Sequence, residues 1–490
     1  MDTLLITGRK AFEIVRGYAG DVADTVVANI DVAALISPRV LRDLLKEVNL
    51  SKYELILIPG NISADFSRLE DEFGIKIRLG PRYAYDLPII LSKIGEVELS
   101  KTTPACGFLE PDPDAIANEL LELEETSVPA LTIGGVKIGG NSSMKVMAEI
   151  VDATSMDQAQ LEREVRYFTN EGANIIDIGV EFDATVDDVK RAVELAKSAT
   201  ALPVSLDTME PDLIRAGIDS GAKLILSLDK DNINEVGMDI AEADIPVVVL
   251  SRSGLDELFE TIELARSIGI NKVIADPILA PLGHGVTRSI HDYYRFREVD
   301  PTTPLFFGIG NVTELLDADS VGVNACLAGI GMELSVSILF APEASWKTKG
   351  SVRELVKSSM MMRLASKRRS PPKDLGIDLF VAKEKRMREG VPIADTEEDI
   401  LTITDEPQWS SDPLGYFRIA VKDGMIFVEY NLPDGQIEVM QGMHAKEIVA
   451  HIVREGKISM IEHGAYLGVE LAKAELALKL KRSYVQDEEI

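Results

Sequence analysis

The fold is decided by the stretch Gly172-Ala173-Asn174-Ile175-Ile176-Asp177-Ile178-Gly179, a glycine-bounded apolar run with one acidic residue near its end. Short apolar runs of this kind are typical of strands buried on both faces of a parallel sheet. An apolar run followed by a helical pattern occurs eight times across residues 140–365. The predicted strands are 145–150, 175–178, 204–207, 224–228, 247–250, 273–275, 305–308 and 337–340. Eight such units predict a (β/α)8 barrel, with an open doubly wound sheet as the alternative.

Two smaller domains are predicted beside this barrel. Residues 1–125 alternate apolar strands with helical stretches and predict a small, Rossmann-like α/β domain. Residues 366–410 begin with the basic, proline-containing run 367–373, which is typical of an exposed linker. Residues 411–490 show strand pairs separated by glycine-containing turns and then helices, so they predict an α+β domain.

Composition excludes several classes of protein. The formal net charge of −30 argues against a nucleic-acid-binding surface, because phosphate contacts need clustered Lys and Arg. No apolar run approaches the roughly 18 to 20 residues of a membrane span. The start, Met1-Asp2-Thr3-Leu4, does not resemble a secretory signal, so we expect a cytoplasmic protein. Cys106 and Cys326 are far apart and give no thiolate metal site.

Polar residues at the ends of the predicted strands are the candidates for chemistry, because barrel enzymes carry their sites there. These candidates are Glu149, Asp152, Asp177, Asp207, Asp229, Asp276 and Asn311. A rim of carboxylates suits a planar ligand that offers several N–H donors along one edge, as a pterin does. Each Asp alone is also explained as a helix cap that follows a strand. Carboxylates bind Mg²⁺ as well, so a metal-dependent barrel lyase would show a similar set.

Four motifs resemble those of dihydropteroate synthase and its pterin-binding relatives in order and spacing. They are the stretch 172–179, Ser205-Leu206-Asp207-Thr208, the stretch 221–225 and Ala275-Asp276-Pro277. The resemblance covers roughly half the chain, and the complete arrangement is similar to the archaeal proteins called dihydropteroate-synthase-related. It implies that Asp207 and Asp276 bind the pyrimidine edge of a pterin, with Asp229 assisting from the fourth strand.

The chain departs from that family after the seventh strand. Dihydropteroate synthases use a Lys there, and an Arg-x-His at the eighth strand, for the second substrate and the diphosphate. This chain has no Lys or Arg between Asp300 and Trp346. Its run Gly308-Ile309-Gly310-Asn311-Val312 instead resembles a motif of methyltetrahydrofolate-dependent corrinoid methyltransferases. That resemblance implies that Asn311 is catalytic and contacts the pterin near its methylated nitrogen, whereas a helix cap is the other interpretation.

Our hypothesis is a pterin-binding transferase of folate or tetrahydromethanopterin one-carbon metabolism. Methyl transfer from a reduced pterin of the tetrahydromethanopterin or tetrahydrofolate type comes first, with a corrinoid on a partner protein as one acceptor. The alternatives are condensation of a pterin diphosphate with an arylamine, and a non-catalytic pterin-binding scaffold subunit. We predict no tightly bound metal, and since barrels of this family often pair, a homodimer is also considered.

The last predicted helix carries one unusual histidine. His463 stands at the start of this helix, and the run 462–475 resembles a small C-terminal module of several archaeal one-carbon proteins. Packing and function explain His463 equally well at this point.

Overall fold

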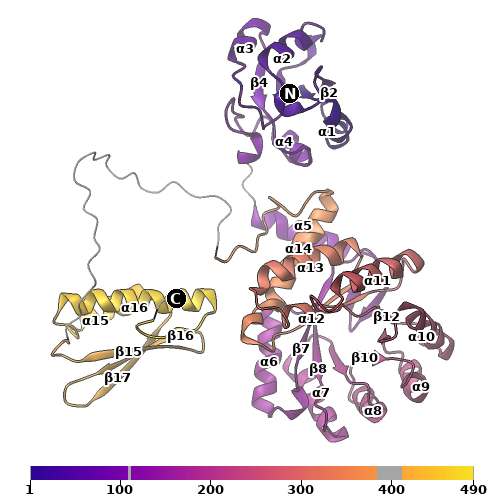
Figure 1. Ribbon diagram of the computed structural model, residues 1–490, viewed down its shortest axis with the longest axis vertical. Helices are drawn as coiled ribbons and strands as arrows, with labels where there is room; N and C mark the ends of the chain where they lie inside the picture. Colours follow the sequence, from indigo (N-terminus) through magenta and orange to yellow (C-terminus); the bar gives the residue numbers. More distant parts are fainter. Residues whose placement is uncertain (1, 109–111, 383–410, 489–490) are drawn as a thin grey trace. The chain divides into compact units, whose positions relative to one another are not determined.

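The computed structural model describes residues 2–108, 112–382 and 411–488. The chain forms two compact units, Met1–Leu379 and Phe380–Ile490 (Figure 1). Most of the predicted linker, residues 383–410, lies outside the described residues. Among the helices that the structure describes, none has the length and apolar character needed to cross a membrane.

The central part is a parallel eight-stranded barrel, which confirms the predicted fold class. Its strands are β7 (Lys145–Ile150), β8 (Ile175–Gly179), β9 (Val204–Asp207), β10 (Leu224–Leu228), β11 (Val247–Leu250), β12 (Val273–Asp276), β13 (Phe306–Gly308) and β14 (Ile338–Pro342). They are hydrogen-bonded in the order β12-β11-β10-β9-β8-β7-β14-β13. The bridge between Ala275 and Leu305 joins β12 to β13 and brings the two ends of the sheet together.

Helices surround these strands, as Figure 1 shows. They are α6 (Gln158–Glu171), α7 (Val186–Ala199), α8 (Pro211–Asp219), α9 (Ile233–Ala243), α10 (Leu255–Ile268), α11 (Val286–Val299), the short α12 (Gly310–Thr313), α13 (Ser320–Glu333) and α14 (Ser351–Arg368). Local sequence explains where several begin: Asp157 and Thr185 form capping boxes at the first turns of α6 and α7. Apolar residues between strands and helices form the largest core cluster.

A second apolar cluster fills the interior of the barrel. It joins Met147, Ile175 and other inward residues of the strands to Ile133 and Ile138. These two come from a hairpin of β5 (Leu131–Ile133) and β6 (Val136–Ile138) that the sequence did not predict. The hairpin lies near Pro203 and Pro304, which precede strands, so it closes the end of the barrel opposite the strand C-termini. The polar rim is therefore the open end.

The N-terminal part has a parallel sheet in the order β2-β1-β3-β4, as expected for an α/β domain. Its strands are β1 (Thr3–Thr7), β2 (Asp24–Val27), β3 (Leu55–Ile58) and β4 (Lys76–Leu79), with helices α1 (Phe12–Ala19), α2 (Pro38–Leu45), α3 (Ser67–Phe73) and α4 (Leu87–Ser92). A further helix, α5 (Pro113–Glu125), is joined to α14 by the ion pair of Glu119 with Arg368, at 2.6 Å. The predicted domain boundaries stay predictions.

The C-terminal unit is an α+β domain. An antiparallel sheet of β15 (Tyr416–Lys422), β16 (Met425–Asn431) and β17 (Ile437–Gly442) is covered by α15 (Ala445–Arg454) and α16 (Ile461–Leu480). Alternate residues of β15 and β16, such as Phe417, Ile426 and Val428, face the helices in a core of their own. This unit is built as the sequence predicts.

Candidate functional site

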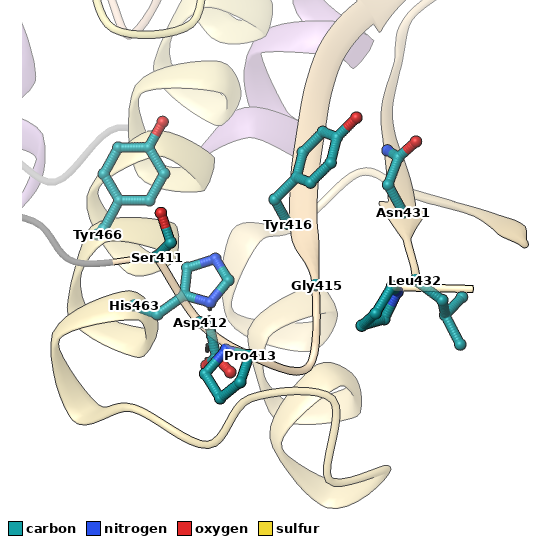
Figure 2. A pocket seen from close by; sticks show the side chains of 10 residues that line it. Ser411, Asp412, Pro413, Gly415, Tyr416, Asn431, Leu432, His463 and Tyr466 are labelled. Atoms are coloured by element: carbon teal, nitrogen blue, oxygen red, sulfur yellow. Dashed lines mark hydrogen bonds and ion pairs between the residues drawn. The ribbon is translucent and has the colours of Figure 1, made fainter. Parts of the chain in front are cut away.

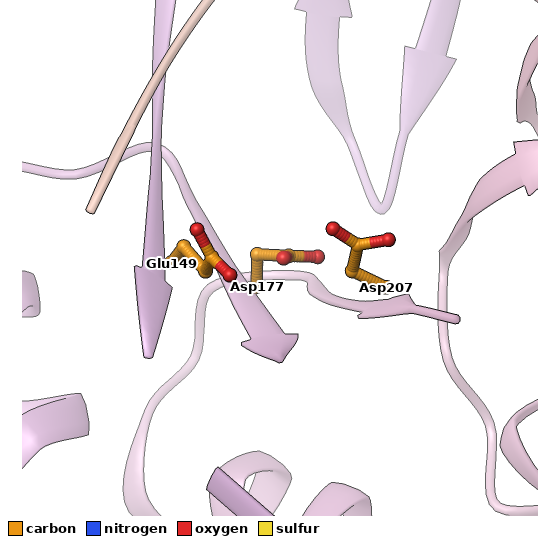
Figure 3. Close-up of side chains that lie close together, drawn as sticks. All are labelled: Glu149, Asp177 and Asp207. Carbon is orange, nitrogen blue, oxygen red and sulfur yellow. The ribbon is translucent and has the colours of Figure 1, made fainter. Parts of the chain in front are cut away.

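The register of three neighbouring strands brings acidic residues together at the open end of the barrel. Glu149 on β7 is paired with Asp177 on β8, which is paired with Ser205 on β9, and Asp207 follows two residues later. Residues two apart on a strand point to the same face, so these side chains share the interior. One carboxylate oxygen from each of Glu149, Asp177 and Asp207 lies within 4.8 Å of the others (Figure 3).

Asp177 is the most deeply buried member of this acidic trio. It is fully buried, its Oδ1 accepts a hydrogen bond from Ser205 Oγ at 2.5 Å, and its Oδ2 has no partner among the described residues. Burial, with the charges of Asp207 and Glu149, holds the pKa of Asp177 well above its ordinary value of 3.8. The raised pKa favours the protonated form of Asp177, and Oδ2 is the carboxyl oxygen that no described residue contacts by a hydrogen bond.

The other two carboxyl groups also resist ionisation. Burial and the charges of Asp207, Asp152 and Glu314 raise the pKa of Glu149 to about 7. Burial and the charge of Asp276 raise the pKa of Asp207 to about 6. All three carboxyl groups of the trio therefore have raised pKa values, as expected for buried carboxyl groups that lie close together.

Asp276 stands at the end of β12 and is held by two donors. Its Oδ1 accepts from the Ile278 backbone N–H at 2.8 Å and lies 2.9 Å from the hydroxyl of the buried Tyr293. Burial raises the pKa of Asp276 to about 6, although both hydrogen bonds oppose this rise. In the described chain Oδ2 has no hydrogen-bond partner, so it is the oxygen available to a ligand.

Asn311 lies in α12, after β13, and its side chain has a fixed orientation. Its Nδ2 donates to the backbone carbonyl of Leu279 at 2.9 Å. Because a carbonyl only accepts, this contact selects the nitrogen side of the amide, and Oδ1 is left without a partner within the described ranges. The residue is exposed. Asn311 therefore joins two loops of the rim and presents a hydrogen-bond acceptor.

Two predicted site residues, Asp229 and Asp152, are not members of the acidic trio. Asp229 uses Oδ1 to accept from the backbone N–H groups of Asp231 and Asn232, at 2.8 and 3.2 Å, so it caps the turn before α9. Asp152 is exposed and adopts a left-handed conformation with φ 51°. It acts on the site through its charge, which helps to raise the pKa of Glu149.

The cations that follow the strands are mostly bound to acids outside the trio. Lys347 pairs with Asp317 at 3.0 Å, and Arg353 pairs with Glu171. Arg252 differs, because its guanidinium lies 3.2 Å from the sulfur of Met209, two residues after Asp207. This arrangement supplies little positive charge for a leaving diphosphate, whose developing charge needs such stabilisation.

A divalent cation is a further candidate ligand of the trio. Three carboxylates match the oxygen donors that Mg²⁺ and Ca²⁺ prefer. The predicted absence of a tightly bound metal therefore stays a prediction.

The sequence did not single out Glu314 as an organiser of the rim. Its carboxylate accepts from the backbone N–H groups of Ala344 and Ser345, at 3.0 and 3.2 Å, and from the hydroxyl of Thr348, at 2.6 Å. These bonds attach the loop after β14 to the end of α12. The partners are 30 or more residues apart, so no local pattern could have indicated them.

Two family models match parts of the chain. Residues 143–300 match the family described as CO dehydrogenase/acetyl-CoA synthase delta subunit, and residues 411–487 match the family PterinBD-DUF4346. Uncharacterized protein MJ0107 of Methanocaldococcus jannaschii is 35% identical, over 99% of this chain and 98% of its own length.

More distant relatives match a little under half of the chain. The gamma 2 subunit of the acetyl-CoA decarbonylase/synthase complex of Methanosarcina thermophila is 26% identical over 45% of this chain, which spans 51% of that subunit. Among solved structures, Yersinia pestis dihydropteroate synthase is 18% identical with a TM-score of 0.40, and covers 48% of this chain and 98% of its own. The Thermus thermophilus enzyme is 18% identical with a TM-score of 0.37, over 45% and 94%.

Proposed function

The chain belongs to the family of the Methanocaldococcus jannaschii protein MJ0107, and we propose that it is a transferase that binds a reduced pterin at the open end of its barrel. The carrying observation is the acidic rim: Glu149, Asp177 and Asp207 lie on the neighbouring strands β7, β8 and β9, and Asp276 ends β12. A pterin offers a 2-amino group and a ring N–H along one edge, and carboxylates accept such paired donors. A rim with few free cations suits this neutral edge better than a phosphate.

The proposed reaction is methyl transfer from the pterin to a nucleophilic acceptor. The C–N bond to the methyl group breaks, the pterin nitrogen keeps the electron pair and takes a proton, and the acceptor's electron pair forms the new bond to carbon. Asn311 Oδ1 would accept a hydrogen bond from the protonated nitrogen, an interaction that strengthens as the proton arrives. Glu149, with a pKa of about 7, is suited to store that proton at neutral pH.

The relatives support a proposal for the acceptor and the biological setting. Residues 143–300 match a delta-subunit family, and the gamma subunits that resemble this chain belong to a multisubunit complex. We therefore propose an acceptor carried on a partner protein, with a corrinoid as the leading chemistry. The pterin would be of the tetrahydromethanopterin or tetrahydrofolate type, and the proposed site residues are those of the rim with Asn311.

Condensation of a pterin diphosphate is less well supported by the site. Lys347 and Arg353 are bound to Asp317 and Glu171, and Lys230 is bound to Glu257. Arg252 contacts the sulfur of Met209, two residues after Asp207, and one exposed guanidinium gives limited stabilisation to a leaving diphosphate.

Titration calorimetry tests the pterin site. The protein is titrated with reduced folate and reduced methanopterin, each with and without the methyl group. Asp207→Ala should abolish binding, whereas Asp183→Ala, which removes an exposed carboxylate of the loop before α7, should not. No binding of any pterin would refute the proposal. Binding without turnover, for every acceptor offered, would replace the transferase with a pterin-binding scaffold subunit.

A further inference from the structure

The C-terminal unit holds a cavity of its own. It has a volume of about 610 Å³, within the range of small-molecule sites. Its walls include Ser411, Tyr416, Asn431, Leu432, His463 and Tyr466 (Figure 2). The described residues that line it include no Lys, Arg or Glu, and its one carboxylate, that of Asp412, is already engaged with protein donors.

Asp412 is surrounded by donors. Its Oδ1 accepts from Leu414 N–H at 3.0 Å and Ser459 Oγ at 2.6 Å, and its Oδ2 accepts from Ser459 and Met460 N–H at 2.8 and 3.0 Å. Oδ2 also lies 3.2 Å from Nδ1 of His463. An ionised carboxylate can only accept, so Nδ1 of His463 must carry the hydrogen.

In the neutral ring this hydrogen bond selects the tautomer whose Nε2 is the acceptor. The His463 side chain is 10% exposed, and its ring centroid is 5.4 Å from that of Phe417 and 6.5 Å from that of Tyr466. Figure 2 shows the ring edge away from Asp412 turned toward the space between Ser411 and Tyr416. Nε2 has no hydrogen-bond partner in the described part of the chain. The side chain is mostly buried while Nε2 is open to the cavity, so a ligand N–H that enters the cavity can donate to it.

A purely structural role explains only half of this arrangement. The bonds of Asp412 attach the start of β15 to the start of α16, and Nδ1 of His463 contributes to that junction. The junction between β15 and α16 does not require a cavity at Nε2. It also does not require a tyrosine in the cavity wall, where the Tyr416 side chain is about half exposed. Aromatic walls with a few polar groups are typical of sites for flat organic ligands.

We propose that this cavity is a second ligand site, which binds a neutral, planar nitrogen heterocycle of the purine or pterin class. A ring N–H of the ligand donates to Nε2 of His463, and the ring packs against Tyr416. The hydroxyl of Ser411 and the amide of Asn431, whose Nδ2 already donates to Glu429 at 3.0 Å, belong to the lining of the same cavity and would contact polar atoms on the ring edge. The absence of Lys and Arg from the described lining disfavours a ligand held by a phosphate. This inference does not depend on the proposed barrel function.

The full chain is suited to a direct test, because it contains five histidines whose ring signals can be resolved by NMR. The probes are pterin and hypoxanthine, added to the Asp207→Ala protein so that the barrel site does not compete. We expect the Nε2 signal of His463 to have the shift of an unprotonated nitrogen and to move in a saturable way. The signals of His444 and His451 should stay fixed.

Two further variants separate binding from folding. Tyr416→Ala should weaken probe binding about tenfold, the order expected for loss of one aromatic contact. Tyr294→Ala, which truncates a similarly exposed tyrosine on α11, should leave it unchanged. The proposal is overturned if neither probe moves the His463 signal, or if Tyr416→Ala and Tyr294→Ala bind equally well. Either result leaves the barrel assignment intact, because calorimetry with reduced pterins tests that separately.

Discussion

Replacing Asp207 by Asn should stabilise the protein above neutral pH. Burial and the Asp276 charge raise the pKa of Asp207 from 3.8 to about 6. The stability linked to this raised pKa is fully present below about pH 4 and is lost as pH rises through 6, because the folded state holds the proton more tightly. This pKa difference corresponds to about 3 kcal/mol at pH 8. Since Asp207 is only partly buried, solvent screening reduces our expectation to about 2 kcal/mol.

Thermal unfolding at pH 4 and pH 8 measures this effect. Among the described residues no group donates a hydrogen bond to the Asp207 carboxylate, so Asn removes charge without breaking a bond. For a barrel of this size about 2 kcal/mol raises Tm by roughly 4–8 °C at pH 8, and the difference should vanish at pH 4. Asp183→Asn, on an exposed loop, is the matched control and should change neither value. A lower Tm for Asp207→Asn at pH 8, or an equal gain at both pH values, would refute the charge argument.

Four other outcomes are expected. Asn311→Ala should keep pterin affinity within about threefold but slow methyl transfer about 100-fold in single-turnover kinetics, and equal losses would make Asn311 a binding residue only. Asp229→Asn should leave calorimetric pterin affinity unchanged, because Oδ1 is held in its own turn; a loss like that of Asp207→Ala would show direct contact. Glu314→Ala should lower stability by about 3 kcal/mol, measured by denaturant unfolding, since three hydrogen bonds disappear; Glu314→Gln should lose less. Although burial opposes it, hydrogen bonds led by that of Ser459 hold the pKa of Asp412 well below 3.8. The stability that this lowered pKa gives is present above about pH 4 and is lost as the pH falls further. Unfolding followed by circular dichroism should therefore show that the stability of Asp412→Asn depends less on pH in acid than that of the unchanged protein. The same pH dependence in both proteins would contradict this prediction.

The barrel could be predicted from the sequence because each strand is a short apolar run with a helical pattern after it. The family match over residues 143–300, which contains all four motifs, confirms the resemblance to pterin-binding proteins that the motifs indicated. Other strands gave no such signal. β4 alternates Lys76 and Arg78 with apolar residues, and the strands of the hairpin β5–β6 have three residues each. A segment that short has no measurable period, so its place inside the barrel depends on packing alone.

Positions in the site were more predictable than interactions. Asp207 and Asp276 could be found because barrel sites lie at strand ends. Whether an Asp faces a ligand or caps a turn depends on its rotamer. Asp229 follows a barrel strand and precedes a helix, so its sequence position is compatible with either role. Glu314 contacts residues that lie 30 or more positions later in the chain, and Asp412 contacts Ser459, 47 positions later. These contacts therefore depend on the tertiary fold.

The raised pKa of Asp177 helps to explain how four acids can share one rim. If all of them were ionised, their repulsion in a partly buried space would oppose folding. The pKa of Asp177 is raised well above 3.8 and that of Glu149 to about 7, whereas the pKa values of Asp207 and Asp276 are about 6, so Asp207 and Asp276 ionise more readily than Glu149 near neutral pH. Those two residues end β9 and β12, which are separated by β10 and β11 in the sheet. They can therefore approach one flat ligand from different sides, while the acids of β7 and β8 hold the protons that the proposed methyl transfer needs.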